Sequence, residues 1–385
     1  MDSVEIVKVA SPFGNLAPIY EVDPDADALL IVPPSKRTFA PWHEIDGGQR
    51  ITPGLRIKVS SKHLALASRA FRNRLQFGNS KAARQSDGRV HLTLAEGFDA
   101  KAVSIVMKAI HGRGSKVPKA ADLETLAQIA LFVDRFQLLD AVEVYAERWI
   151  SKLEDSIPDT YNQDLVRWIY ISHVFHDADI FKAVTKVAAV HSAGPIDSLG
   201  LPIREKIIQH IDTQRQTLVN QTLTHLHQTL DTLTSGTVAC PTHHCDSLLL
   251  GELIKSLHKH RLVWPRPAKP FPGLGFASIV AGVAGGVSVH LQDQQQPHHH
   301  RQEVEPCSSG GGSGGGTPGW GVVGGVFPIT PAASPEPVYR GGSGRFGDGY
   351  ECEARRVVAR LGGLGRLEEG VQGLVLESGL GYRVY

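Results

Sequence analysis

The alternation of apolar and polar side chains marks two short strands in the first hundred residues. It occurs at residues 57–59 and again at 91–94, and successive side chains of a strand point to opposite faces. The unbroken apolar run at residues 28–32 predicts a third strand. Ser60 and Ser61 precede a segment with helical spacing. We therefore predict one helix that extends to about residue 75, with these apolar positions: Leu64, Leu66, Ala67, Ala70, Phe71 and Leu75.

Helical periodicity predicts three further helices within residues 91–113 and 121–150. The period of 2 in the strands and of 3.6 in the helices identifies the side chains that face a common core. We expect the following to lie mostly inside: Leu64, Leu66, Ala67, Phe71, Leu92, Leu94, Val103, Val106, Ile110, Leu126, Ala127, Ala130 and Leu138.

Three blocks of sequence carry a family resemblance: RIKVSSKHLALASRAFRNRL (56–75), HLTLAEGFDAKAVSIVMKAIHGR (91–113) and ADLETLAQIALFVDRFQLLDAVEVYAERWI (121–150). They resemble the BTB/POZ domain of filamentous fungi, which reads V-S-S-x-x-L, A-S-x-x-F-x-x-x-L, a strand, and a helix that ends in I-I-H-G-R/K. The resemblance implies an α+β (α/β) fold in which a small sheet caps a cluster of helices. The Pro- and Gly-rich insert at 33–54 departs from the family, and we expect an exposed loop there.

Composition divides the chain into four segments. We expect a disordered N-terminus (1–25), a BTB/POZ-like domain (26–155), a mostly helical region (156–276) and a low-complexity, disordered, Gly-rich tail (277–385). Residues beyond about 290 are expected to be dispensable for folding. Lys269 is the last lysine, and a tail that uses Arg alone is also typical of a GC-rich stretch translated in an unintended frame. Transcript sequencing across the codons for residues 275–300 tests that hypothesis.

Three helices are predicted in the region from 156 to 276. Residues 159–175 have an aspartate at their start as a candidate cap and apolar side chains at 165, 166, 168, 169 and 171. Pro202 is placed to open a helix over 203–233, and residues 247–262 form an amphipathic helix. Leu223, Leu226, Leu230 and Leu233 make a seam of two heptads. Coiled coils need three or four, so docking through one apolar stripe is the preferred interpretation and a coiled coil is the alternative.

Charge and composition exclude several classes of protein. The chain has 385 residues, enough for about two domains, and a formal charge of +1, which gives no electrostatic basis for binding nucleic acid. Its four scattered cysteines indicate a reducing compartment, and we expect a cytoplasmic or nuclear protein. The N-terminus lacks the apolar region of a signal peptide. No apolar window reaches the roughly 20 residues of a membrane span.

One cluster has the chemistry of a zinc site: Cys240, His243, His244 and Cys245. Both histidines lie between cysteines only five residues apart, so the loop is too tight to close a tetrahedron alone, and His258 or His260 would have to complete it. The alternative is that the cysteines are small packing residues at a helix start, with Asp246 near the N-cap. The segments CDSLLLGEL and WPRP also fit the family resemblance. We therefore assign no metal, catalytic or cofactor site.

Other polar groups have structural interpretations. The histidines at 298–300 belong to a low-complexity tract, and the glycines from 310 to 316 lack the Lys-Ser/Thr of a phosphate loop. His63 is placed as an outward helix position, and His111 as a capping histidine at a helix C-terminus. We expect a solvated helix face with no role in nucleic-acid binding for Arg69, Arg72, Arg74 and Arg84.

The resemblance implies a non-catalytic protein–protein interaction adaptor without cofactors. Its partners would be other proteins: a cullin-type ubiquitin ligase scaffold, with the chain as substrate adaptor, or alternatively corepressors, with the chain as a nuclear transcriptional regulator. The family's partner surfaces match residues 62–75 and 113–125. Homodimerisation is expected through residues 62–75 and 28–32, with a monomer shielded by the insert as the alternative. The region after residue 155 is the candidate for client recognition.

Overall fold

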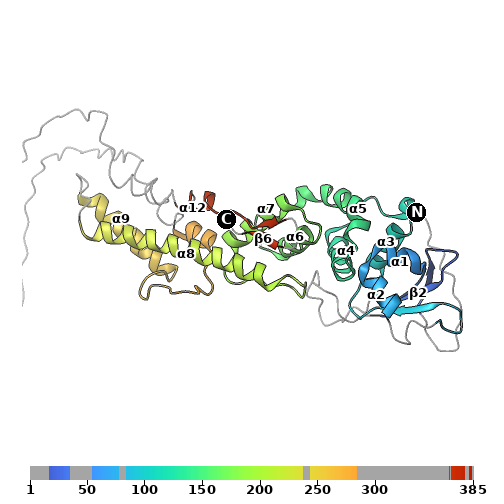
Figure 1. Ribbon diagram of the computed structural model, residues 1–385. Helices are drawn as coiled ribbons and strands as arrows, with labels where there is room; N and C mark the ends of the chain where they lie inside the picture. The colour runs from blue at the N-terminus through green and yellow to red at the C-terminus, as the bar shows by residue number, and fades with distance from the viewer. Residues whose placement is uncertain are drawn as a thin grey trace, which may run out of the picture.

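The computed structural model describes residues 17–34, 54–77, 84–236, 243–283, 364, 366–377 and 381–383. A small sheet lies at one end of an elongated molecule, and two long helices lie at the other (Figure 1). The molecule is mixed α/β and mostly helical. Within the described residues, no helix is both long enough and apolar enough to cross a bilayer. The insert is described only at its two ends, and the histidine tract and the Gly310–Gly316 run lie outside the described residues.

The four-stranded sheet has the order β1-β3-β2-β4 and consists of β1 (Ile19–Glu21), β2 (Ala28–Val32), β3 (Leu55–Val59) and β4 (Val90–Thr93). β2 and β3 are antiparallel, with Leu30 opposite Ile57, whereas β1–β3 and β2–β4 are parallel. The three predicted strands are confirmed. The fully disordered N-terminus is wrong at β1, because this strand pairs with β3 through backbone groups that the side-chain pattern does not report.

The single helix predicted from Ser60 to about residue 75 is wrong. The structure has two helices, α1 (Ser61–Ala67) and α2 (Arg69–Phe77). Ser68 between them has an extended backbone, and its hydroxyl donates to the Phe136 carbonyl at 2.5 Å and accepts from the Phe71 amide at 3.0 Å. Ser68 therefore ends α1 and caps α2, because its hydroxyl accepts a backbone N–H group of the first turn of α2.

This arrangement also explains why the burial predicted for Leu66 is wrong: its side chain is 80% exposed. Leu64 of α1 is fully buried, and two residues along a helix rotate a side chain by about 200°, so Leu66 points the opposite way. Most of the predicted core is confirmed, while Ala67 and Ile110 are only half-buried.

Three helices complete the sheet-containing part: α3 (Ala100–Ile110), α4 (Leu123–Phe136) and α5 (Leu139–Ser151). Asp99 and Asp122 cap α3 and α4 by accepting backbone N–H groups at 2.7 Å. Phe71 stacks on Phe136 with ring centroids 4.5 Å apart, and Phe98 and Phe132 extend this aromatic cluster. Short 3-10 turns follow α3 and α5: η1 (Gly114–Lys116) and η2 (Glu154–Ser156).

The next helices are α6 (Gln163–Val174), α7 (Ala178–His191), α8 (Glu205–Thr234) and α9 (His243–Lys259). The expected aspartate cap of α6 is wrong, since Asn162 accepts the Leu165 amide at 2.9 Å. α8 begins three residues after Pro202. The predicted leucine seam from 223 to 233 is buried against α9, as expected of a helix docked by one stripe.

The apolar core forms two main clusters that share α8. The first joins the sheet, α1 to α7 and the start of α8, where Ile207 and Ile211 lie inside it. The second surrounds the rest of α8 from Val219 onward and includes α9 and residues 262–283. Arg215 lies between these two stretches of α8.

Part of the predicted disordered tail is folded against the helices, and the prediction is wrong for these residues. They include α12 (Arg366–Glu369) and a hairpin of β5 (Val375–Glu377) and β6 (Gly381–Arg383). Leu374 is fully buried, and its amide donates to the Thr185 hydroxyl at 2.9 Å. Gly373 lies so close to the Lys182 carbonyl that a side chain would collide with it. This Gly-rich stretch therefore contributes at least one side chain, that of Leu374, to the core beside α7.

Candidate functional site

The face made by α1 and α2 combines one exposed leucine with several cations. Leu66 projects from α1, and Arg69, Arg72 and Arg74 are exposed on α2, in agreement with the predicted solvated face; Arg84 is also exposed and lies in the segment after α2. Three of these arginines donate to nearby carbonyls: Arg72 to Ala65 at 2.9 Å, Arg74 to Thr93 at 3.0 Å and Arg84 to Gly88 at 2.7 Å. These contacts hold the arginines along the local backbone and leave Leu66 as the one strongly apolar group of this face among the described residues.

Fewer apolar side chains are exposed for self-association on residues 28–32 and 62–75 than the sequence predicts. Leu29 is 6% exposed and Phe71 is fully buried, so both belong to the chain's own core. Ile31 is half-buried. Leu66 is therefore the residue of the predicted interface that remains available to a partner.

His111 links the end of α3 to the start of α1, which confirms its predicted capping role. Its Nδ1 lies 2.8 Å from the Met107 carbonyl, and its Nε2 lies 3.0 Å from the Ser60 amide. Because the carbonyl only accepts and the amide only donates, the ring is neutral with its proton on Nδ1. Burial lowers the pKa of His111, which favours this neutral form.

Asp23, His63 and His111 bring three potential metal ligands within 4.8 Å of one another. Both ring nitrogens of His111 are already engaged, so this histidine has no lone pair free for an ion. Asp23 and His63 alone are too few for a transition-metal site. His63 is exposed, in agreement with its prediction as an outward position, and its ring lies 5.0 Å from that of His111. The cluster is a structural contact between α1 and α3.

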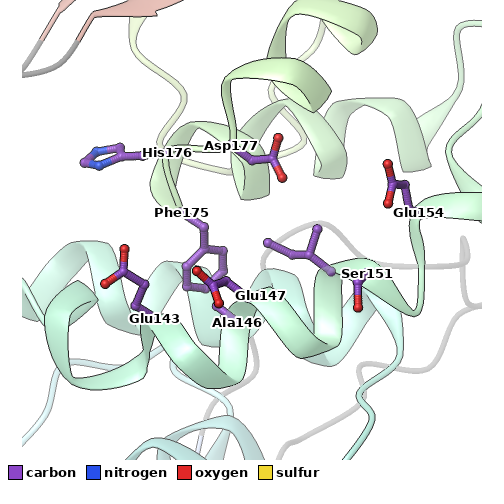
Figure 2. Close-up of a pocket in the computed structure, with 9 residues that line it drawn as sticks. Glu143, Ala146, Glu147, Ser151, Glu154, Phe175, His176 and Asp177 are labelled. Atoms are coloured by element: carbon purple, nitrogen blue, oxygen red, sulfur yellow. The ribbon is translucent and has the colours of Figure 1, made fainter.

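A hollow of about 360 Å³ lies between α5 and the turn that joins α6 to α7. Glu143, Glu147, Glu154 and Asp177 bring carboxylates to it, and Ala146, Ile150 and Phe175 contribute apolar surface (Figure 2). Val144, on the same helix, is 73% exposed. Acidic walls beside apolar side chains suit a basic, partly apolar peptide segment, because such a segment satisfies the charge and buries the apolar surface.

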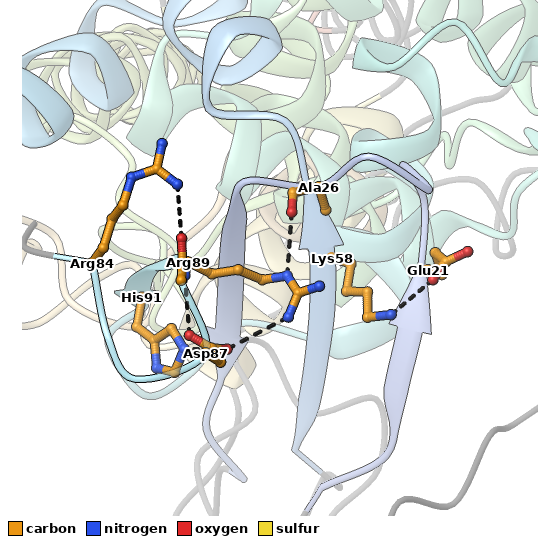
Figure 3. Close-up of polar contacts among 8 residues, drawn as sticks. Glu21, Ala26, Lys58, Arg84, Asp87, Arg89 and His91 are labelled. Atoms are coloured by element: carbon orange, nitrogen blue, oxygen red, sulfur yellow. Dashed lines mark hydrogen bonds and ion pairs between the residues drawn. The ribbon is translucent and has the colours of Figure 1, made fainter.

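Polar contacts on the sheet have partners within the chain. Asp87 contacts His91 at 3.0 Å and Arg89 at 3.7 Å, and Arg89 also donates to the Ala26 carbonyl at 3.2 Å (Figure 3). The hydrogen bond from His91 is the main reason that the pKa of Asp87 is lowered. These contacts fasten the loop before β4 to the strand system and are structural.

The structure rules out the proposed completion of the zinc cluster. α9 is continuous from His243 to Lys259, and fifteen residues at 1.5 Å each put His258 about 22 Å from His243 along the axis. Zinc ligands lie about 2 Å from one ion, so His258 cannot share a site with His243. His260 lies just beyond the same helix and is excluded for the same reason. Cys240 and the side chains of His243, His244, Cys245 and Asp246 lie outside the described residues.

Comparison with known proteins gives no family. Neither the protein-family models nor the curated proteins searched contain a match to this chain.

The acidic hollow does not follow from the sequence pattern. Its carboxylates come from two segments more than twenty residues apart, and only the fold brings them together. One local feature could have indicated this surface: Glu143 and Glu147 lie one helical turn apart on the same face of α5. Two like charges at that spacing do not stabilise the helix, so the pair has no role in helix stability.

Proposed function

We propose that the chain is a non-catalytic protein-interaction adaptor built on a BTB/POZ-type domain. The observation that carries the proposal is the exposure of Leu66, 80% of whose side chain is open to solvent. Leu66 lies on α1, within residues 62–75, where the resemblance places a partner surface. An isolated exposed leucine is common, so the proposal also depends on the arrangement around it.

The order and pairing of the elements support the proposal. An antiparallel pair, two short helices, a strand parallel to the first of that pair and three longer helices follow one another from β2 to α5. This is a small sheet capping a cluster of helices, as the resemblance implies. The acidic hollow on α5 offers a second surface for a partner's basic segment.

The test compares partner recovery by the full chain with recovery by a Leu66→Arg variant. The expected result is that Leu66→Arg loses specific partners seen by affinity purification and mass spectrometry, because a charge replaces an apolar contact at the interface centre. Leu248→Arg is the matched control, since Leu248 is 51% exposed on α9, outside this surface. Recovery of a cullin-type scaffold supports the ligase adaptor, whereas recovery of corepressors supports the nuclear regulator.

Sedimentation of the same proteins over a hundredfold concentration range separates self-association from binding to other proteins. A wild-type dimer that Leu66→Arg converts to a monomer places the dimer interface at α1. If the wild type is a monomer at all concentrations, the adaptor acts as a single chain and self-association is not part of its function. An identical set of partners for the wild type and Leu66→Arg would contradict the proposal for this surface.

A further inference from the structure

A second, smaller hollow lies beside the edge strand β1 and gathers three cations. Its volume is about 200 Å³. It is lined on one side by Lys108, Arg113 and Lys116 and on the other by Tyr20, Glu21, Val22 and Pro24. Lys108 comes from the last turn of α3, Lys116 from η1, and Arg113 from the connection between them. The sequence KAIHGRGSK thus delivers three positive side chains to one place.

Two of these cations are held in position by the protein itself. The Lys108 ammonium lies 5.0 Å from the centroid of the Tyr20 ring, which attracts it through the ring face. Arg113 donates from Nε to the Val22 carbonyl at 3.0 Å, a bond that leaves its terminal nitrogens available. A ligand that meets side chains already in place loses less affinity to their ordering.

The hollow carries more positive than negative charge, because Lys108, Arg113 and Lys116 line it together with one carboxylate, that of Glu21. Glu21 also lines the hollow, but its carboxylate pairs with Lys58 at 2.8 Å (Figure 3). Among the described residues, no carboxylate forms an ion pair with Lys108, Arg113 or Lys116. Burial, and secondly the charge of Lys116, lower the pKa of Lys108. Like charges brought together in a partly buried place favour the binding of an anion.

We propose that this hollow binds an oxyanion, a carboxylate or phosphate group, between Lys108, Arg113 and Lys116. Guanidinium and ammonium groups donate charge-assisted hydrogen bonds to such oxygens. The volume falls below the roughly 300–1,000 Å³ typical of sites for drug-sized ligands, so a small charged group fits better than a cofactor. This site goes beyond the adaptor function and does not rest on it. The oxyanion arrives either as a free ion or on an acidic or phosphorylated side chain of a protein.

Isothermal titration of the full chain with three probes tests the site: inorganic phosphate, acetyl-Gly-Glu-Gly-amide and acetyl-Gly-phosphoserine-Gly-amide. The expected dissociation constant for phosphate is on the order of 1 mM. The double variant Lys108→Gln/Lys116→Gln should weaken binding of the preferred probe at least tenfold. The control Lys101→Gln/Lys152→Gln removes the same charge from exposed lysines, one of them on the same helix α3, and should bind as the wild type does.

The outcomes separate the sources of the anion. Tighter binding of either peptide than of inorganic phosphate identifies an oxyanion carried on a protein, whereas phosphate binding at least as tight identifies a free ion. Equal weakening by both double variants would show only the effect of net charge and would overturn the proposal, as would undetectable binding of all three probes by the wild type. If the variant fails to fold, nuclear magnetic resonance of lysine-labelled wild type decides: phosphate must shift the side-chain resonances of Lys108 and leave those of Lys101 unchanged.

Discussion

The two core clusters of the molecule are held together by different means. The first, around the sheet and α1 to α7, depends on pairings between residues far apart in the sequence, such as Leu30 with Ile57, and on the stacked rings of Phe71 and Phe136. The second is a leucine stripe of α8 packed on α9, together with a loop fastened by one buried arginine. The first cluster is specified by the shapes of the side chains that pack in it. The second is held by the leucine stripe of α8, which would fit many apolar partners, and by the hydrogen bonds of one buried arginine, Arg215.

The comparison also shows that the helical region is not separate from the sheet. α6 packs on α4, and the beginning of α8 belongs to the first cluster. A boundary near residue 155 marks a change of elements along the chain, but the apolar core continues across it. The independent part of the second cluster begins after Arg215.

The largest expected effect comes from the first cluster. Phe71→Ala should lower the free energy of unfolding by about 3–5 kcal/mol, because it leaves a cavity beside Phe132 and Phe136. Denaturant unfolding followed by fluorescence of the buried Trp149 and Trp168 measures it. Leu66→Ala is the control and should change little. An unchanged midpoint for Phe71→Ala would show that this ring is not part of the core.

Arg215 is the polar anchor of the second cluster. It is 1% exposed, pairs with Asp212 at 2.7 Å, and donates to the carbonyls of Pro270, Phe271 and Leu274. Arg215→Leu should cost about 3 kcal/mol, since three carbonyls and Oδ1 of Asp212 lose their donor, while Gln216 still donates to Oδ2 of Asp212.

Thermal unfolding by circular dichroism measures the loss, and the exposed Arg72→Leu serves as the control. Because Arg215 lies between the clusters, a separate early transition of α9 and of the part of α8 after Arg215 is expected. A single transition at the wild-type temperature would contradict the anchor role.

The docked tail segment gives an intermediate effect. Leu374→Ala should cost about 2 kcal/mol, the lower end for a buried leucine, because it removes apolar contacts of a fully buried side chain. Removal of residues 364–385 should lower the melting temperature in the same direction. A truncated chain as stable as the full one would restore the prediction that everything beyond about residue 290 is dispensable.

The smallest expected effect is a dependence of stability on pH, and it comes from His173 of α6 in the first cluster. Burial, followed by the charges of Arg204 and His176, lowers the pKa of His173 to about 4. Between pH 6.5 and 4 the unfolded chain binds a proton at this histidine and the folded chain does not, so stability falls as the pH falls.

From pH 7.5 to 5, His173 should account for about 1 kcal/mol of lost stability, after allowance for its partial exposure. His173→Gln should remove that part of the loss in urea titrations at the two pH values. An equal loss in the variant would assign the pH dependence to other groups, among them His111.

Local pattern was enough for much of the fold. The strands at residues 28–32, 57–59 and 91–94, the buried face of α6 and the cap at His111 all follow from periodicity and local hydrogen bonding, and the structure confirms them. The sequence failed where a partner lies far along the chain. Ser68 breaks a helix because Phe136 supplies the acceptor, sixty-eight residues away.

Sites made from several elements show the same division. The acidic hollow joins residues of α5 to Phe175 and Asp177, and the cationic hollow sets Lys108 against Tyr20. By itself the sequence determined which segments form helices and strands and which of their faces are apolar, because hydrophobic spacing and capping act over a few residues. Only the tertiary structure decided that Leu66 lies outside, that Leu374 lies inside, and that separated charges share a hollow, because burial and electrostatic interaction depend on distance in space.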